Sequence, residues 1–330
     1  MRIDEPGNQK QKAPSASIML VSYKNFESTT LHCLNSLFSL SELDQLQIII
    51  VDNASGEETT SRINHLIKDK ENVEFISNKK NRGFPGGAND AAKRATSDII
   101  FFLDIDTIIP DGAIRKLSDI INQNPDWIVG PVTNQTGSEQ KIFTESNEPI
   151  EILSEGKAWC QHAKNSTLKV RQLDFCCIGM KRSTLEDIGP LEEGFGMGYY
   201  EDTDFCHRAH RKKYPLMMIE DVFIYHKGGG TSMNSKEQLK KSRKFFLSKH
   251  GAAGRESLLR QRDLNLRALN YYSDMLEYSP VQKDNILFRV KNRLQLADHL
   301  WPKNPIKKLL YAKKIRTIKN KLKNRGLNLH

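Results

Sequence analysis

The sequence predicts an α/β fold in which a mostly parallel sheet is flanked by helices and followed by an α-helical C-terminal extension. Two observations support this prediction. Short apolar runs alternate with helical segments over roughly the first 120 residues, the pattern of parallel strands joined by crossover helices. Beyond residue 236, helical periodicity dominates and little strand signal remains. We therefore expect a disordered lead-in over residues 1–15, an α/β domain over 16–250 and a helical, basic extension over 251–330.

The predicted strands are short apolar runs, and the predicted helices repeat apolar residues at helical spacing. The first helix, for example, places Leu31, Leu34 and Leu37 on one face. Strands are expected over 17–22, 46–51, 73–77, 99–103 and 222–225, and helices over 31–38, 57–70, 90–95, 111–122 and 205–212. Residues 143–168 show no clean period, so we expect a loop region there.

The composition limits the class of protein. With 330 residues and 38% hydrophobic content, the chain can fill a sizeable core. Its longest apolar runs are about five residues, far short of the ~20 that cross a bilayer, and the polar N-terminus lacks a signal-peptide pattern. The five cysteines are odd in number and show no C-x-x-C spacing, which favours a reducing cytoplasm over a disulfide scaffold or a zinc site.

Polar side chains follow three of the predicted strands. Ser22-Tyr23 follows the first strand, Asp52-Asn53 the second, and Asp104 and Asp106 the fourth. The carboxyl ends of parallel strands meet at one edge of a sheet, where ligands of such folds bind. The two aspartates form a D-x-D pair of hard oxygen ligands that suits Mg²⁺ or Mn²⁺, and such an ion could carry a diphosphate.

Asp52 has two possible roles. It could accept a hydrogen bond from the ring N–H of a pyrimidine base, or it could cap the helix that follows. The sequence leaves both open. The Gly-rich segment from Asn81 to Asn89 is expected to form a turn that lets a ligand approach the backbone closely. It matches neither the G-x-G-x-x-G fingerprint nor a P-loop.

Two later clusters complete the set of chemically capable residues. Glu201, Asp202 and Asp204 follow two tyrosines, and a carboxylate in a partly apolar cleft can serve as a general base. Capping of a helix is the alternative explanation, although it accounts for one or two acids better than for three. His226 ends a predicted strand before three glycines, so it could ligate the same cation as the aspartates. His207 and His210 are expected to be structural members of a basic helix.

Taken in order, these motifs resemble the family 2 inverting glycosyltransferases of the GT-A fold, in particular bacterial rhamnosyltransferase-like enzymes of surface polysaccharide synthesis. The resemblance covers residues 16–232. The motifs that carry it are V-S-Y-K-N at 21–25, V-D-N-A-S at 51–55, N-R-G-F-P-G-G-A-N at 81–89, L-D-I-D at 103–106, Y-Y-E-D-T-D-F-C-H-R at 199–208 and Y-H-K-G-G-G-T-S at 225–232.

The resemblance implies a Rossmann-like GT-A domain and a role for each motif. Asp202 would be the catalytic base, and Asp106 and His226 would hold Mn²⁺ or Mg²⁺, with Asp104 contacting the metal or the ribose. The remaining donor-binding residues would be Ser22, Tyr23, Asp52, Asn53, Asn81, Gly83 and Glu201. The activity implied is metal-dependent, inverting transfer of a hexose from a UDP- or dTDP-sugar to a hydroxyl of a glycan or lipid-linked acceptor.

The basic tail suggests a further partner. All of the net charge of +10 lies between Lys303 and Arg325, a stretch without Asp or Glu. Lysines there alternate with Ile306, Leu309, Leu310, Ile315, Ile318 and Leu322. Such a basic amphipathic helix suits an anionic membrane surface at the inner face of the plasma membrane. A helical bundle face or a homo-oligomer contact is the alternative. Nucleic-acid binding is not expected, because aromatic residues are sparse among the lysines.

Two other functions are compatible with parts of this sequence. A sugar-nucleotide pyrophosphorylase shares an α/β nucleotide-binding sheet. Such an enzyme would require a Gly-rich loop with Arg and Lys after the first strand. Residues 21–26 offer Lys24 and no glycine. A non-catalytic glycan- or nucleic-acid-binding protein would use the basic tail, yet it would not need the acids at 104, 106 and 202.

Overall fold

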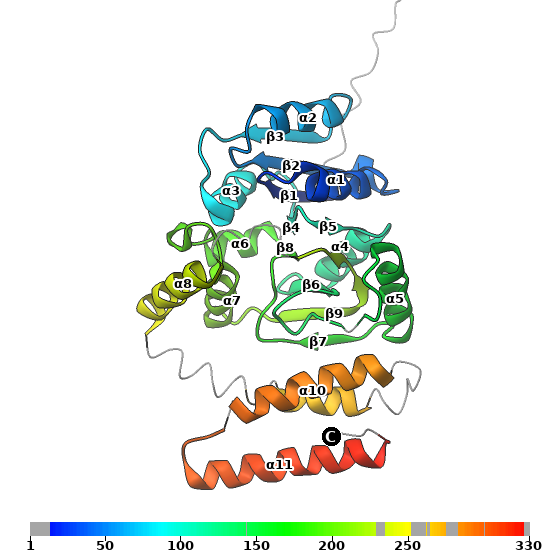
Figure 1. The fold of residues 1–330 in the computed structure, drawn as a ribbon, viewed down its shortest axis with the longest axis vertical. Coiled ribbons are helices and arrows are strands. Elements are labelled where there is room, and N and C mark those ends of the chain that lie inside the picture. The colour runs from blue at the N-terminus through cyan, green and yellow to red at the C-terminus, as the bar shows by residue number, and fades with distance from the viewer. Residues whose placement is uncertain are drawn as a thin grey trace, which may run out of the picture.

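The computed structural model describes residues 14–142, 144–228, 235–251, 262, 265–274, 283–299 and 301–326. Nearly all of the predicted lead-in and the glycines after Gly228 lie outside these ranges. The predicted α/β architecture with C-terminal helices is confirmed: one eight-stranded sheet is flanked by helices, and α10 and α11 stack beyond its β7 edge (Figure 1).

The sheet has the strand order β3-β2-β1-β4-β8-β6-β9-β7. The first four neighbours pair in parallel, whereas β8 runs antiparallel to both β4 and β6, and β7 runs antiparallel to β9. The strands are β1 (Ala16–Ser22), β2 (Leu46–Asp52), β3 (Val73–Ser77), β4 (Ile99–Asp104), β6 (Ile128–Val132), β7 (Thr167–Lys169), β8 (Cys177–Lys181) and β9 (Leu216–Phe223). A separate two-stranded ribbon joins β5 (Thr107–Ile108) to β10 (Tyr225–His226).

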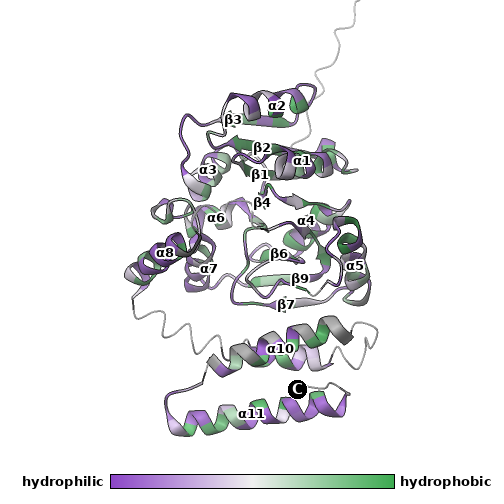
Figure 2. Ribbon diagram, viewed as in Figure 1, coloured by the Kyte–Doolittle hydropathy of each residue, from purple (hydrophilic) through white to green (hydrophobic). Residues whose placement is uncertain are grey.

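Helices flank the sheet on both faces, and two more lie beyond its β7 edge (Figure 1). The flanking helices are α1 (Leu31–Phe38), α2 (Glu57–Ile67), α3 (Gly83–Ala92), α4 (Ala113–Gln123), α5 (Pro149–His162), α6 (Arg182–Ile188), α7 (Glu201–Arg211) and α8 (Ser235–His250), and those beyond the edge are α10 (Lys283–His299) and α11 (Pro305–Asn324). Successive strand residues enter different cores: Ile18 packs in one cluster with α1 and α4, and Met19 in the other with α3 and α7. This two-sided burial explains why the central strands are apolar throughout, as Figure 2 shows in green.

The Gly-rich segment is helical, which corrects the predicted turn and the predicted helix start at residue 90. Helix α3 begins at Gly83, and Pro85 lies in its first turn, where a missing N–H costs no hydrogen bond. Glycine is required for packing here. A Cβ on Gly83, whose φ is +70°, would lie 1.8 Å from the carbonyl oxygen of Gly196, and one on Gly87 would lie 2.8 Å from Val21.

Three further predictions on secondary structure were wrong. Residues 149–162 form α5 instead of a loop, and a buried Trp159 anchors that helix in the core. The strand expected over 222–225 is the end of the longer β9, and His226 lies in the separate ribbon. Helix α7 begins at Glu201, four residues earlier than expected. In each case tertiary packing outweighs a weak local pattern.

The C-terminal helices are attached to the sheet by a buried polar cluster. Glu220 of β9 is fully buried and accepts hydrogen bonds from Trp159 Nε1 at 3.0 Å and Tyr272 Oη at 3.1 Å. Arg289 of α10 pairs with the same carboxylate at 3.3 Å. A buried charge with so many partners is costly to separate from them, so α10 is held firmly against the β9 side of the sheet.

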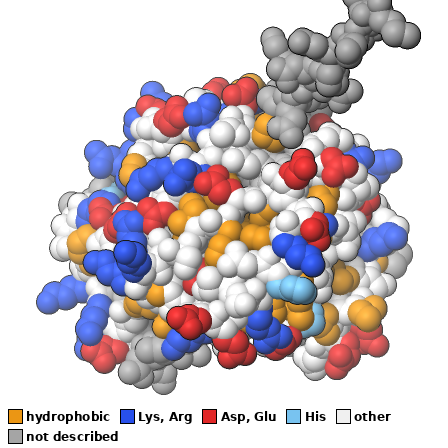
Figure 3. All heavy atoms as spheres, turned by 90° about the horizontal axis from the view of Figure 1, so that it is seen from above, with side chains coloured by type: hydrophobic (Ala, Val, Ile, Leu, Met, Phe, Trp, Pro, Cys, Tyr) orange, Lys and Arg blue, Asp and Glu red, His pale blue; other side chains and the backbone are white. Residues whose placement is uncertain are grey.

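Helix α11 corrects the predicted amphipathic face. Its later apolar residues, Tyr311, Ile315, Ile318 and Leu322, are buried within the protein. Only the start of the helix exposes large apolar side chains, with Ile306 71%, Leu309 72% and Leu310 56% accessible. At the opposite end of the molecule, positive and negative side chains are interspersed (Figure 3), as expected if the excess charge resides in the tail.

Candidate active site

The polar strand ends converge at one edge of the sheet, as predicted. Strand register places Ser22 beside Asp52, and Asp104 beside Val21 on the other flank of β1. The ribbon formed by β5 and β10 starts directly after the D-x-D pair, and it aligns His226 with Thr107. Residues more than 100 positions apart therefore share one recess at the carboxyl ends of the strands.

Asp104, Asp106 and His226 form a cluster that could hold a metal ion. One ligand atom from each lies within 4.8 Å of the others. His226 Nε2 lies 3.1 Å from Asp106 Oδ1 and 3.8 Å from Asp104 Oδ2. Two carboxylate oxygens and one imidazole nitrogen form a donor set that suits Mn²⁺ or Mg²⁺.

Hydrogen bonds with neighbouring residues orient the His226 ring so that Nε2 could bind a metal ion. Its Nδ1 lies 2.6 Å from the carbonyl oxygen of Gln135, so Nδ1–H donates there and Nε2 faces the aspartates. The side chain of Asn134 bonds both backbone groups of His226, accepting from N at 2.9 Å and donating to O at 3.0 Å. This arrangement is the one that metal-ligating histidines use.

The charges in this recess perturb one another. Burial, and next the charge of Asp106, raises the pKa of Asp104 to about 7. Burial opposes a charge on His226, but the hydrogen bond and the negative charge of Asp106 outweigh it and raise the pKa of His226 to about 9. The recess thus attracts a positive charge, which a divalent cation would supply in place of the imidazole proton.

Asp202 lies at the start of α7 beside a second carboxylate, Asp174. Its Oδ1 accepts from the backbone N of Thr203 at 2.5 Å, and its Oδ2 accepts from Gln172 Nε2 at 3.1 Å. Asp174 and Asp202 share a side-chain hydrogen bond. Burial and then the charge of Asp202 raise the pKa of Asp174 to about 8, so Asp174 carries the shared proton at neutral pH.

Hydrogen bonds from Thr203, Asp174 and Gln172 surround the Asp202 carboxylate. Burial raises the pKa of Asp202, while these bonds act against that rise. A carboxylate whose pKa is raised by burial is suited to take a proton from a hydroxyl. Asp174 was missed in the sequence, because it stands in a segment without periodicity and no acidic neighbour draws attention to it.

Glu201 and the tyrosines before it shape the same region. Burial and then Asp202 raise the pKa of Glu201 to about 8, and its Oε2 is buried without a hydrogen-bond partner among the described residues. Tyr199 and Tyr200 adopt left-handed φ values of +66° and +73°. Non-glycine residues seldom do so, and such strain concentrates at functional sites.

Asp52 makes the capping contacts that the sequence left open, and base binding by it stays a prediction. Its Oδ2 accepts from Ser55 N at 3.2 Å and from the Thr60 hydroxyl at 3.3 Å, which fastens the start of α2. Its Oδ1 is buried and has no partner within the described chain. Such an orphaned acceptor is costly unless a ligand satisfies it. Tyr23 is partly exposed nearby, whereas the buried Ser22 hydroxyl bonds Thr30 at 3.1 Å.

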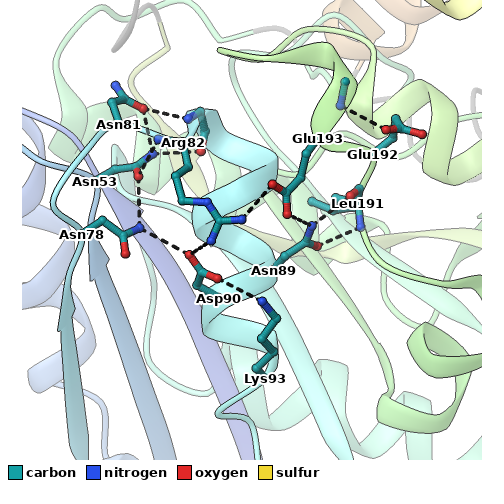
Figure 4. A network of polar contacts seen from close by, with 12 residues as sticks. Asn53, Asn78, Asn81, Arg82, Asn89, Asp90, Lys93, Leu191, Glu192 and Glu193 are labelled. Atoms are coloured by element: carbon teal, nitrogen blue, oxygen red, sulfur yellow. Dashed lines mark hydrogen bonds and ion pairs between the residues drawn. The ribbon is translucent and has the colours of Figure 1, made fainter.

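Asn53 and Asn81 fasten the start of α3 to the strand ends, as Figure 4 shows. Asn53 Nδ2 donates to Asn81 Oδ1 at 3.0 Å and to the Gly83 carbonyl at 2.8 Å, and Asn81 Oδ1 also accepts from Gly83 N. Arg82 bonds Asp90 and Glu193 in the same network. The polar groups of Asn53, Asn81 and Gly83 are therefore engaged within the protein, and donor binding by them stays a prediction.

The segment 133–141 connects the C-terminal helices to this site. Glu139 pairs with Arg293 of α10 at 2.6 Å, and its carbonyl accepts from Arg289 at 2.7 Å. A few residues earlier, Thr136 and Gly137 bond Asp174, and Asn134 and Gln135 orient His226. The sequence offered no signal for this link, because its members come from distant, aperiodic segments.

Comparison with known families decides between the alternatives drawn from the sequence. The family model described as "Glycosyl transferase family 2" matches residues 17–189, more than half of the chain. The chain belongs to glycosyl transferase family 2. The pyrophosphorylase and the non-catalytic binding protein are therefore set aside. The protein is a glycosyltransferase, and the match covers the strands that end at Asp52 and Asp104 and the turn that holds Asp106.

Named relatives of this family 2 glycosyltransferase act in glycan synthesis. The chain is 27% identical over 226 residues to the low-salt glycan biosynthesis hexosyltransferase Agl10 of Haloferax volcanii, covering 66% of this chain and 69% of that protein. It is 30% identical over 142 residues to the poly(ribitol-phosphate) beta-glucosyltransferase of Bacillus spizizenii. That match covers 42% of this chain but only 22% of the longer relative.

A solved structure shows the same fold. The mannosyltransferase of Pyrobaculum calidifontis, determined with GDP-Man and Mn²⁺, aligns with 96% of this chain and 86% of its own, with a TM-score of 0.51 and 12% identity. The fold of the glycosyltransferase is therefore GT-A. Among the described residues, we find no helix with the length and apolar character that a membrane span requires.

Proposed function

We propose that this protein is a metal-dependent, inverting hexosyltransferase that uses a nucleoside-diphosphate sugar. The observation that carries the proposal is the convergence of Asp104, Asp106 and His226 at the edge of the sheet that also holds Asp52. Asp202 lies near enough that its charge also raises the pKa of Asp104. The Mn²⁺ in the mannosyltransferase structure supports a divalent ion here, and we propose Mn²⁺ or Mg²⁺.

Each residue then has a task in donor binding. Asp106 and His226 would hold the ion with Asp104, which would also serve the ribose. A bound divalent ion would stabilise negative charge on the leaving diphosphate. The free Oδ1 of Asp52 accepts the ring N–H of a pyrimidine base, so we propose a UDP- or dTDP-sugar. Tyr23 lies by the base, and Glu201 contacts the donor sugar.

Asp202 acts on the acceptor as the catalytic base. It takes the proton of an acceptor hydroxyl, whose oxygen forms a bond to the anomeric carbon as the bond to the diphosphate breaks on the opposite face. The anomeric configuration inverts. Asp174 keeps its own proton and donates it in a hydrogen bond to Asp202, which keeps Asp202 oriented and ionised before the reaction.

The setting of the reaction is also part of the proposal. The acceptor is a glycan or lipid-linked acceptor of cell-surface polysaccharide synthesis, in line with the roles named for the two relatives. The five cysteines are free, as expected in the cytoplasm. The exposed first two turns of α11, with Lys303, Lys307 and Lys308 beside them, contact anionic lipid at the inner face of the plasma membrane. We place the boundary of the catalytic domain at residue 250.

A panel of nucleotide sugars tests this function. We expect a UDP- or dTDP-sugar to raise the melting temperature in the presence of Mn²⁺ or Mg²⁺ and to be hydrolysed slowly with water as acceptor. Excess EDTA should abolish both effects. Full hydrolysis in EDTA would contradict the metal role, and stabilisation by purine-sugar donors alone would contradict the role of Asp52.

A further inference from the structure

A cavity of about 230 Å³ lies between α7 and α8, outside the proposed metal and base-binding groups. Its lining is strongly basic. Arg171 borders it before β8, His207 and His210 come from α7, and Arg243 comes from α8. No Asp or Glu lines the cavity among the described residues. A ligand there would therefore meet the positive charges of Arg171 and Arg243, which come from two separate segments.

Arg243 is the donor that a ligand can engage. Within the described part of the chain it forms no ion pair, whereas Nε2 of His210 already bonds the Arg171 carbonyl at 2.7 Å. The rings of Tyr200 and Phe246, whose centroids are 5.5 Å apart, also line the cavity. A guanidinium without an ionic partner beside a cavity is well suited to pair with an anion.

The cavity adjoins the proposed catalytic base. Gln172 and Thr203 both line it, and both also donate hydrogen bonds to Asp202. A group bound in the cavity is therefore separated from the base by single side chains. Because Asp202 is proposed to act on the acceptor hydroxyl, an occupant of this cavity belongs to the acceptor, whereas the donor diphosphate belongs with Asp104, Asp106 and His226.

We propose that this cavity binds a phosphate group of the acceptor, an inference that rests on the proposed function. Guanidinium groups pair with phosphate through charge-assisted, often bidentate hydrogen bonds. The guanidinium groups of Arg171 and Arg243 come from two separate segments, so they can pair with different oxygens of a tetrahedral phosphate. The enzyme would thus select acceptors whose phosphate stands next to the sugar or alditol that receives the hexose.

Inorganic phosphate is the probe for the first experiment. The full-length protein is melted at increasing phosphate in EDTA, with NaCl holding the ionic strength constant, so that neither a metal ion nor general screening contributes. We expect the melting temperature to rise with phosphate. Arg243→Gln should require at least tenfold more phosphate for the same rise. Arg243 is exposed on α8, so this variant is expected to fold normally.

Lys244→Gln is the matched control, because it removes the same charge from the neighbouring exposed position outside the cavity. It should respond to phosphate as the wild type does. An equal response of Arg243→Gln, or no response of the wild type, would overturn the inference. Metal-dependent hydrolysis of a nucleotide sugar by the wild-type protein tests the donor side separately. If hydrolysis is absent, the proposed function fails; if hydrolysis is present but Arg243→Gln binds phosphate normally, only the cavity inference fails.

Two model compounds distinguish the source of the phosphate. Dimethyl phosphate represents a phosphodiester-linked polymer, and geranyl diphosphate represents a polyprenyl diphosphate carrier. A response of the wild type to either compound that Arg243→Gln weakens at least tenfold supports the proposal and identifies the acceptor class. A response to glucuronate with none to any phosphate compound would overturn it in favour of an acidic sugar.

Discussion

The Nε2 atom of His226 lies 3.1 Å from Oδ1 of Asp106, although the two residues are far apart in the sequence. The antiparallel pairing of β10 with β5 brings them together, and Lys227 N donates to the Asp106 carbonyl at 2.9 Å beside that pairing. The recess therefore exists only when the ribbon forms.

Replacement of Asp202 should lower the rate of transfer without weakening donor binding. Asp202→Asn should lower kcat by about 10²- to 10⁴-fold, because the amide cannot accept the hydroxyl proton. Donor affinity, measured by calorimetry with a non-hydrolysed donor analogue, should stay within a few-fold of wild type. Asp187→Asn changes an exposed carboxylate and should leave both quantities unchanged. Parallel loss of donor binding in Asp202→Asn would make Asp202 structural.

Asp174 is expected to act as a hydrogen-bond donor. Asp174→Asn retains an N–H donor toward Asp202 and an oxygen for Thr136 and Gly137, so we expect kcat within about tenfold of wild type. Asp174→Ala removes both and should lower kcat by about 10²-fold or more. Steady-state transfer assays compare the two. If Asp174→Asn is as inactive as Asp174→Ala, Asp174 acts through its charge instead.

The Glu139–Arg293 pair should make stability depend on pH. Burial would raise the pKa of Glu139, but Arg293 and Arg171 outweigh it and hold that pKa below its usual value of 4.5. The stabilisation is therefore present above about pH 4.5 and is lost as the pH falls through the lowered pKa. Glu139→Gln should cost about 3 kcal/mol at pH 7, since it leaves a buried guanidinium unpaired.

Urea unfolding at several pH values measures this dependence. The difference in unfolding free energy between wild type and Glu139→Gln should shrink below pH 4.5. Glu186→Gln, which changes an exposed ion pair with Arg182, should cost less than about 1 kcal/mol at either pH. A difference for Glu139→Gln that is constant with pH would show that its cost is not electrostatic.

The first two turns of α11 should control membrane contact. The triple variant Ile306→Ser, Leu309→Ser, Leu310→Ser removes exposed apolar side chains without touching the buried half of the helix. We expect it to lose flotation with anionic liposomes, while the wild type floats at low salt and less at high salt. Ile150→Ser with Leu239→Ser removes exposed apolar residues elsewhere and should float normally. Flotation of the triple variant would contradict this assignment.

Much of the fold could be predicted because strong local patterns coincide with the tertiary structure. The apolar run 99–103 is β4, and its two aspartates lie at the sheet edge, as the sequence indicates. The pairing of His226 with those aspartates was expected from the family resemblance and from its position before the glycines. The three groups do converge within 4.8 Å, although their role as ligands is still to be tested.

The features that were missed depend on contacts between distant segments. Helix α3 is rich in glycine because other chain segments pack against it, such as Val21 and Gly196, and local propensity cannot reveal that. Asp174 and Glu139 lie in segments without period, so their partners could not be foreseen. The membrane prediction for the tail included Ile315, Ile318 and Leu322, which the protein buries itself.

Direct titration with Mn²⁺ tests the central claim, that Asp104, Asp106 and His226 form a divalent-metal site. Electron paramagnetic resonance of free Mn²⁺ is followed for the wild type, His226→Ala and the exposed control His32→Ala. We predict one saturable site in the wild type and in His32→Ala, and at least tenfold weaker binding in His226→Ala, since the cluster loses its nitrogen ligand. Equal Mn²⁺ affinity in His226→Ala and the wild type would contradict the account.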